Sequence, residues 1–125
     1  MRTLLLLFVL FTANSLFSQE LERHLVHKHK NGKDKVVVYV DPETKERLKE
    51  EIFYSSGKLD YVGNYKNGKE DGKWVYYWEN GNIKSEEFYI RGLEHGVMFD
   101  YNEQGKAIKR YEYKRGDLIS ETVLK

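Results

Sequence analysis

Short segments in which apolar and polar residues alternate make up most of the chain, and glycine-containing turns separate them. β-Branched and aromatic residues with this period of two predict β-strands, and connections this short join antiparallel neighbours. The predicted strands are Lys35–Val40, Lys73–Trp78, Ile83–Tyr89, Val97–Tyr101, Ala107–Tyr113 and Leu118–Leu124. The fold class that we expect is all-β, in the form of a single elongated antiparallel β-meander.

The pattern repeats at an interval of 24 residues. Side-chain columns such as Tyr65, Tyr89 and Tyr113 keep this interval, and so do three columns of glycines. The turn glycines are Gly57, Gly81 and Gly105 in the first column, Gly68, Gly92 and Gly116 in the second, and Gly72 and Gly96 in the third. A period of this length is typical of repeat architectures, in which each unit completes its core by stacking on its neighbours. We expect about three hairpin repeats, preceded by a degenerate leading unit at residues 35–56.

The segment after the first predicted strand has two interpretations. Asp41 and Pro42 suit the start of a helix, which would make residues 42–52 a short helix. Residues 48–54 instead resemble residues 83–89, with the same six-residue step from an aliphatic residue to tyrosine. We favour the second interpretation, a turn at residues 41–46 and a strand from about residue 47.

The first glycine column predicts the register of the hairpins. The residue before the glycine is serine, asparagine or glutamine, and serine and glutamine resist the positive φ that a two-residue type I′ turn needs at both central positions. A three-residue loop that ends in glycine fits better. With that loop Trp78 pairs with Asn82. Tyr77 then pairs with Ile83, so that odd-numbered residues of both strands share one face.

The predicted faces suggest a binding surface. The recurring side-chain columns lie at odd numbers, and we assign their face to stacking between units. The other face carries large apolar residues that do not recur: Trp74, Tyr76, Trp78, Phe88, Ile90 and Met98. An exposed cluster of this size would mark a contact site for a partner. The alternative is that the N-terminal strand or a second copy of the protein covers these residues.

Residues 1–18 are predicted to be a secretory signal peptide. Arg2 gives a basic start to an apolar run that is too short for a comfortable membrane span, and small residues suited to cleavage follow. A retained anchor is the alternative. We expect residues 19–34 to be a polar lead-in, either a loose arm or a short strand, and residues 35–125 to be the repeat domain. The mature chain would then be periplasmic or extracellular and have no transmembrane span.

Composition narrows the classes of function. The 125-residue chain contains no cysteine, so packing and sheet hydrogen bonds alone must hold an exported domain. Without the predicted signal peptide, which contains one basic residue and no acid, 20 basic and 20 acidic residues remain. This balance gives no electrostatic reason to expect binding to nucleic acid.

The sequence contains no motif for catalysis or for metal binding. Metal ligation is one interpretation of His24, His27 and His29, with His95 a distant fourth ligand. No supporting carboxylate pattern accompanies these histidines, and we favour a solvated polar arm. Cross-strand charge pairing explains the carboxylates of the predicted sheet: Glu86, Glu87, Asp100 and Glu112. A nucleophile motif and a phosphate loop are both missing from the sequence. We expect a protein that is not an enzyme and holds no cofactor.

Two segments, YKNGKEDGKWVYY at residues 65–77 and YIRGLEHGVMFDY at residues 89–101, resemble the MORN-repeat variant family. The family's form is a Tyr-x-x-Gly-x-x-x-Gly step followed by an aromatic strand and an Asn-Gly turn, and the resemblance covers about residues 48–125. The last unit departs from this form at Ser120 and Thr122, as a terminal capping unit would. The resemblance implies an elongated antiparallel sheet used for protein or lipid contact. Some similar bacterial proteins are described as antitoxin components, a role that the predicted export signal argues against.

The leading hypothesis is an exported, non-enzymatic repeat module that contacts an unknown protein partner through its aromatic sheet face or a sheet edge. Edge pairing between copies would produce a homo-oligomer. One alternative is contact with an envelope glycan or lipid surface, because exposed aromatic rings can stack on sugars. The other alternative is an antitoxin-like component of a toxin–antitoxin pair.

Overall fold

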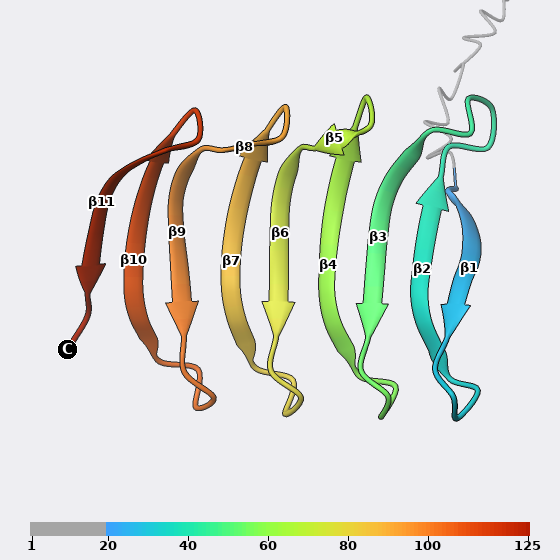
Figure 1. Ribbon diagram of the computed structural model, residues 1–125, viewed down its shortest axis with the longest axis horizontal. Coiled ribbons are helices and arrows are strands. Elements are labelled where there is room, and N and C mark those ends of the chain that lie inside the picture. Colours follow the sequence, from blue (N-terminus) through green and yellow to red (C-terminus); the bar gives the residue numbers. More distant parts are fainter. Residues whose placement is uncertain (1–19) are drawn as a thin grey trace, which may run out of the picture.

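The computed structural model describes residues 20–125, which form one open antiparallel sheet and contain no helix (Figure 1). The predicted signal peptide lies outside the described residues. The strands are β1 (Glu22–Lys28), β2 (Asp34–Val40), β3 (Arg47–Phe53), β4 (Leu59–Lys66), β5 (Lys69–Glu70), β6 (Gly72–Tyr77), β7 (Ile83–Ile90), β8 (Leu93–Glu94), β9 (Gly96–Tyr101), β10 (Ala107–Lys114) and β11 (Asp117–Val123).

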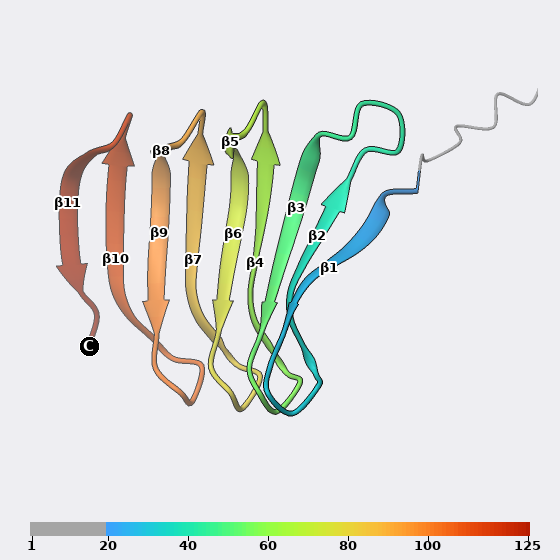
Figure 2. The same ribbon diagram turned by 45° about the vertical axis from the view of Figure 1, so that its right-hand side comes forward.

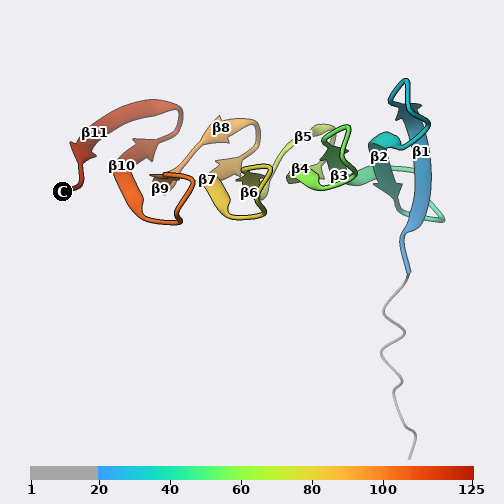
Figure 3. The same ribbon diagram turned by 90° about the horizontal axis from the view of Figure 1, so that it is seen from below.

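The strands follow one another across the sheet in chain order, with the two-residue strands β5 and β8 paired only to β4 and β7. The predicted all-β meander is therefore confirmed. Seen along the strands, the sheet is a single layer (Figure 3), and its first strands are turned relative to the rest (Figures 2 and 3). Within residues 20–125 no second layer covers either face.

The leading part of the chain follows the favoured interpretation. The backbone N–H of Asp41 donates to the carbonyl of Glu46 at 2.9 Å, which closes a turn, and β3 begins at Arg47. The polar lead-in forms β1, the strand alternative, at one edge of the sheet. A tight turn that the glycine columns did not include joins β1 to β2, with Gly32 at a φ of 85°.

The predicted three-residue loops are confirmed at one end of the sheet. The N–H of Trp78 donates to the carbonyl of Asn82 at 2.8 Å, and the N–H of Gly81 donates to the carbonyl of Trp78 at 2.9 Å. Tyr77 pairs with Ile83, as expected. Asn80 keeps a negative φ, and only the glycine adopts the left-handed conformation.

Two-residue turns close the hairpins at the other end of the sheet. Asn67 and Gly68 have φ values of 52° and 76°, the signs that a type I′ turn requires at both central positions. Arg91 and Arg115 take the asparagine's place in the next two turns, with φ values of 52° and 51°. All eight glycines of the three columns have positive φ, between 76° and 97°.

A β-bulge after each three-residue loop reverses the faces of the sheet. In β7, Ile83 pairs with Tyr77 but Ser85 pairs with Tyr76, so Lys84 is an extra residue. Beyond the bulge, odd-numbered residues of β7 share a face with even-numbered residues of β6, and the predicted faces are wrong for most of β7. The equivalent extra residues in β4 and β10 are Asp60 and Ile108.

The core is small because the sheet is one layer thick. Four hydrophobic residues of the described chain are buried: Val37, Trp74, Val75 and Met98. We call the two sides of the sheet the Trp74 face and the Val75 face, after the neighbouring residues of β6 that point to opposite sides. Hydrogen bonds between successive turns, such as that from the Gly92 N–H to the Glu70 carbonyl at 2.8 Å, link the units.

Candidate functional site

The six residues predicted to form a partner surface do not share one face. Tyr76 lies on the Trp74 face, and Met98 does so in β9. Phe88 pairs with Lys73, the neighbour of Trp74, and so points to the opposite face. Ile90 has the same parity as Phe88 and is also on that side. The bulge at Lys84 causes this division, because it shifts the pairing of β7 by one residue.

Trp74 and Met98 belong to the core. Their side chains are 6% and 4% exposed. The Trp74 ring stacks on Tyr61 with centroids 5.7 Å apart, and Tyr65 and Tyr89 meet it edge-on at 5.3 and 5.8 Å. Tyrosines of the adjacent strands therefore cover Trp74, whereas the sequence had suggested the N-terminal strand or a second copy as the cover.

Trp78 has a structural role that recurs in another residue type. Its indole N–H donates to the carbonyl of Tyr101 at 3.1 Å. The hydroxyl of Tyr54, 24 residues earlier, donates to the carbonyl of Tyr77 at 2.6 Å. Both side chains therefore link one unit to the next. Comparison of the repeats did not reveal this shared role, because the two positions hold different residue types. Tryptophan and tyrosine nevertheless each supply one hydrogen-bond donor at the far end of a flat ring.

Exposed apolar side chains gather toward the C-terminal end of the sheet. Seven of the nine large hydrophobic residues that are exposed in the described chain lie in its second half: Phe88, Ile90, Leu93, Ile108, Leu118, Ile119 and Val123. The last three belong to β11, the edge strand. These side chains, rather than the buried Trp74 and Met98, offer apolar area to a partner.

The β11 edge is open. β10 pairs with one side of β11, and no other strand of the described chain lies along its second side. Leu118, Ile119 and Val123 are 51%, 57% and 68% exposed. An edge strand with unpaired backbone groups and exposed apolar side chains can accept a further strand.

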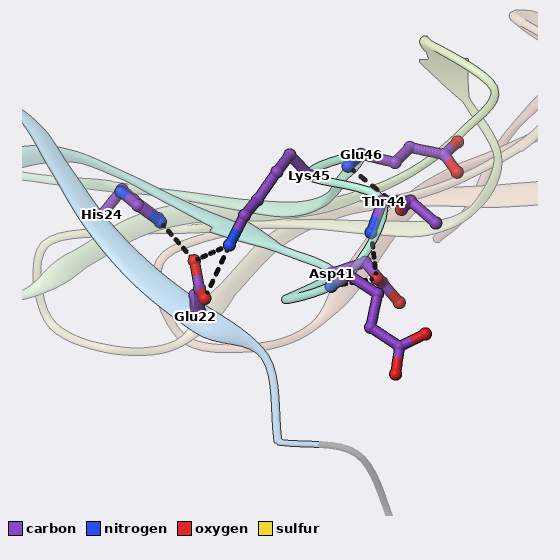
Figure 4. Close-up of polar contacts among 7 residues, drawn as sticks. Glu22, His24, Asp41, Thr44, Lys45 and Glu46 are labelled. Carbon is purple, nitrogen blue, oxygen red and sulfur yellow. Dashed lines mark hydrogen bonds and ion pairs between the residues drawn. The ribbon is translucent and has the colours of Figure 1, made fainter.

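The β1 edge is protected by charge and irregular pairing. Five of its seven residues are ionisable, and its pairing with β2 contains two register shifts. The Lys45 ammonium lies 2.8 Å from Glu22, which also contacts His24 (Figure 4). Lys45, and then His24, hold the pKa of Glu22 below its usual range. Charges and bulges of this kind discourage strand addition at an edge, so the two ends of the sheet differ.

A shallow depression of about 240 Å³ lies on the Trp74 face, across β7, β9 and β10. Its lining includes Tyr89, Tyr111 and Tyr113, and the carboxylates of Glu87, Glu94 and Asp100. The Tyr89 hydroxyl donates to Glu87 at 2.8 Å, and the Tyr111 hydroxyl donates to Asp100 at 2.8 Å. Burial, together with repulsion from Asp100 and Glu94, raises the pKa of Glu87 against the effect of the Tyr89 hydrogen bond.

The described residues offer no site for a metal ion. No three histidine or acidic side chains among residues 20–125 are close enough together to bind one. His29 contacts the carbonyl of Phe53 at 2.7 Å, and His95 accepts the backbone N–H of Arg115 at 3.3 Å. The same residues contain no helix of the length and apolarity that a membrane span requires.

Two units around β4 to β7 are similar to a known repeat family. The family model described as "MORN repeat variant" matches residues 48–67 and 70–91. The two matched segments together make up about a third of the chain. The match ends at residue 91, but β9, β10 and β11 continue the hairpin pairing and the bulges of the matched segments.

Solved structures share the fold of this sheet. One is the "Glycosylation Associate Protein (Gap123) complex from Streptococcus agalactiae", which is 15% identical with a TM-score of 0.53 and covers 84% of this chain and 19% of that chain. Another is the "Crystal Structure of TarM", which is 12% identical with a TM-score of 0.50 and covers 84% of this chain and 20% of that chain. The chain thus spans about a fifth of each, and at these identities the likeness shows the fold alone. Comparison with curated proteins finds no match.

Glu87→Gln is expected to make the sheet more stable at neutral pH. Because burial raises the pKa of Glu87, the folded state gives up this proton less readily than the unfolded state does. The wild-type protein therefore becomes less stable as the pH rises from the usual range of carboxyl pKa values through the raised pKa of Glu87. The variant should gain over the wild type across that window and show no difference in more acidic solution. Urea unfolding at a series of pH values measures this.

The neighbouring Glu86→Gln is the matched control. Lys73, at 2.6 Å, and the Tyr101 hydroxyl hold the pKa of Glu86 below its usual range, so its carboxylate stabilises the folded state at neutral pH. This variant should be less stable than the wild type at neutral pH and equal to it in acid, the opposite sign. The same sign for both variants would show that the burial of Glu87 does not govern its titration.

Proposed function

We propose that this protein is a non-enzymatic repeat module that binds a protein partner by adding a strand of that partner to the β11 edge. The observation that carries the proposal is the asymmetry of the sheet. One edge is open and apolar, and the other is guarded by charge and irregular pairing.

Strand addition suits β11 for two physical reasons. Its unpaired N–H and C=O groups can form a ladder of hydrogen bonds with any extended segment, which gives affinity without a deep pocket. The exposed side chains of Leu118, Ile119 and Val123 would lose apolar surface on contact, at roughly 25 cal/mol for each Å² removed from water. The backbone ladder and the apolar contact would act together.

The proposal includes export and the absence of catalysis. The N-terminal sequence of residues 1–18 supports export to the periplasm or cell exterior. Carboxylates that an acid/base pair would need already have partners on the sheet. Glu86 is bound by Lys73, and Asp100 accepts the Tyr111 hydroxyl. A role in binding an extracytoplasmic protein fits these observations better than an antitoxin-like role in the cytoplasm.

A double variant of the edge strand tests the proposal. Leu118→Lys with Ile119→Lys replaces two exposed apolar side chains by charges of the kind that protect natural sheet edges. Partners captured from an envelope extract by the wild-type protein should bind this variant at least about tenfold more weakly, a loss of about 1.4 kcal/mol. Amide hydrogen exchange of the wild-type complex should show new protection in β11.

Leu25→Lys with Val26→Lys is the matched control, since these are the exposed apolar residues of β1. It should bind the partner as the wild type does. Equal binding by both double variants, or protection confined to β1, would contradict strand addition at β11. The partner could be a second copy of the same protein, and sedimentation tests this case. A dimer formed by the wild-type protein alone and lost in the β11 variant would identify the partner as a second copy.

The depression on the Trp74 face favours a second candidate, the binding of an envelope glycan. Tyrosine rings beside carboxylates offer stacking and hydrogen bonding to a sugar, and Tyr89, Tyr111 and Tyr113 stand beside three acids there. Capture that survives digestion of the extract with a protease, and that the β11 variant retains, would favour this function over strand addition.

A further inference from the structure

The two-residue turns form two equivalent grooves at one end of the sheet. The first groove, of about 290 Å³, is lined by Lys66, Asn67, Lys69, Asp71 and Arg91. The second groove, of about 480 Å³, is lined by Ile90, Arg91, Leu93, His95 and Arg115. Adding 24 to each number in the first list gives the second list. The two grooves therefore have equivalent backbone positions but different side chains, and the first groove can serve as a comparison for the second.

The second groove is apolar where the first is charged. Ile90 and Leu93 take the places of Lys66 and Lys69, and they are 51% and 48% exposed. Because lysines stand at the same places in the first groove, stacking of the units does not require aliphatic residues there. Two adjacent aliphatic side chains held in water at the mouth of a groove indicate contact with something else.

The second groove also presents two cations without partners. Arg91 and Arg115 have φ values of 52° and 51°, a conformation that asparagine accepts more readily and that Asn67 occupies in the first turn. The turn itself therefore gives no reason for arginine. Neither guanidinium lies within 4.0 Å of a carboxylate among residues 20–125.

In the second groove His95 occupies the place that the acidic Asp71 has in the first groove. In the first groove the Asp71 carboxylate accepts the backbone N–H of Arg91 at 3.2 Å. In the second groove Nδ1 of His95 accepts the N–H of Arg115 at 3.3 Å. The turn is held in the same way, but the lining of the second groove has lost its negative charge, which leaves the two guanidinium groups unopposed.

We infer that the second groove binds an extended peptide segment in which aliphatic side chains stand beside a carboxylate. The aliphatic side chains would pack on Ile90 and Leu93, and the carboxylate would take paired N–H donors from Arg91 or Arg115, the geometry that guanidinium groups favour. A volume of about 480 Å³ is within the range of small ligand sites. The groove uses no residue of β11, and this inference does not depend on strand addition there.

A peptide fits this charge pattern better than a membrane surface does. Glu70, Asp71 and Asp117 stand at the same end of the sheet as the two arginines. A flat anionic bilayer would meet these acids as well as the cations, so repulsion by the acids would offset most of the attraction to the cations. A single carboxylate inside the groove would meet only the cations.

Selection of random octapeptides displayed on phage against the full chain tests the inference. The enriched peptides should share an acidic residue flanked by aliphatic residues. An amidated synthetic copy of the most enriched peptide should bind in solution, and its counterpart with glutamine in place of the acid should bind at least about tenfold more weakly. Enrichment of peptides without an acid, or equal binding of both peptides, would overturn the inference.

The side chains of the first groove suggest which substitutions to make in the second groove. Ile90→Lys with Leu93→Lys, and separately Arg91→Asn with Arg115→Asn, give the second groove residues that equivalent backbone positions already accept, so each variant should keep the wild-type melting temperature. Each should weaken binding of the acidic peptide at least about tenfold, while Lys66→Ala with Lys69→Ala should leave that binding unchanged. Binding that these groove variants leave unchanged would overturn the inference. The wild-type protein should not bind vesicles of phosphatidylcholine with one-fifth phosphatidylglycerol. If it binds them and the groove variants do not, the inference of a peptide ligand is overturned in favour of a membrane.

Discussion

Trp74→Ala is expected to lower the free energy of unfolding by about 3–5 kcal/mol, the usual cost of removing a buried large aromatic side chain. The Trp74 side chain is 6% exposed and contacts three tyrosine rings from the two adjacent strands. Its indole N–H also donates to the carbonyl of Asn64 at 3.1 Å. Loss of the ring would leave a gap between these tyrosines in the thin core. Urea unfolding followed by far-UV circular dichroism measures the change.

Trp78→Ala, in the loop that follows β6, serves as the comparison. Trp78 is half-buried and has one hydrogen bond to the next unit, so its loss should cost less than that of Trp74. An equal or larger loss from Trp78→Ala would show that contacts between the turns, rather than the Trp74 cluster, hold the sheet together.

Gly63→Ala is expected to destabilise the sheet by about 1–3 kcal/mol through overpacking. Gly63 is buried beside Trp74, and a Cβ atom built on it would lie 2.4 Å from two atoms of the indole ring. Its φ is not positive, so the backbone conformation does not require glycine. The indole ring requires it, because the ring lies against the neighbouring strand. Urea unfolding again gives the free energy.

A double-mutant cycle separates this explanation from a general effect of alanine. Once Trp74 is alanine, the clash is gone, and adding Gly63→Ala should change stability by less than about 0.5 kcal/mol. The interaction energy between the two changes should then be about 1–3 kcal/mol, within the range seen for residues in contact. Additive costs would mean that the indole ring is not what excludes a side chain at position 63.

Much of the fold followed from local chemistry. The three-residue loop at Gly81 was predictable because the residue before each first-column glycine varies while the glycine does not, and only glycine adopts positive φ without cost. The turn at residues 41–46 followed from the similarity of residues 48–54 to residues 83–89. The first prediction used the conformational preference of single residues, and the second used the recurrence of a short pattern along the chain.

The faces beyond the loops could not be predicted in this way. The extra residue at Lys84 leaves no mark in the sequence, since a bulge needs neither glycine nor proline, yet it exchanges the two faces for the rest of β7. The expected shared face of Trp74 and Phe88 failed for this reason. The roles of Trp78 and Tyr54 were hidden too, because different side chains supply the same donor to the next unit.

The sequence alone determined the 24-residue unit, the turns that glycine makes possible, the strands between them and the family resemblance, because each depends on backbone preferences over a few residues. Tertiary structure alone decided which aromatic residues are buried, which edge of the sheet is open, and which of two equivalent grooves is apolar. These properties depend on which strands become neighbours and on pairing shifts of a single residue. In a sheet one layer thick, such a shift decides whether a side chain joins the core or faces a partner.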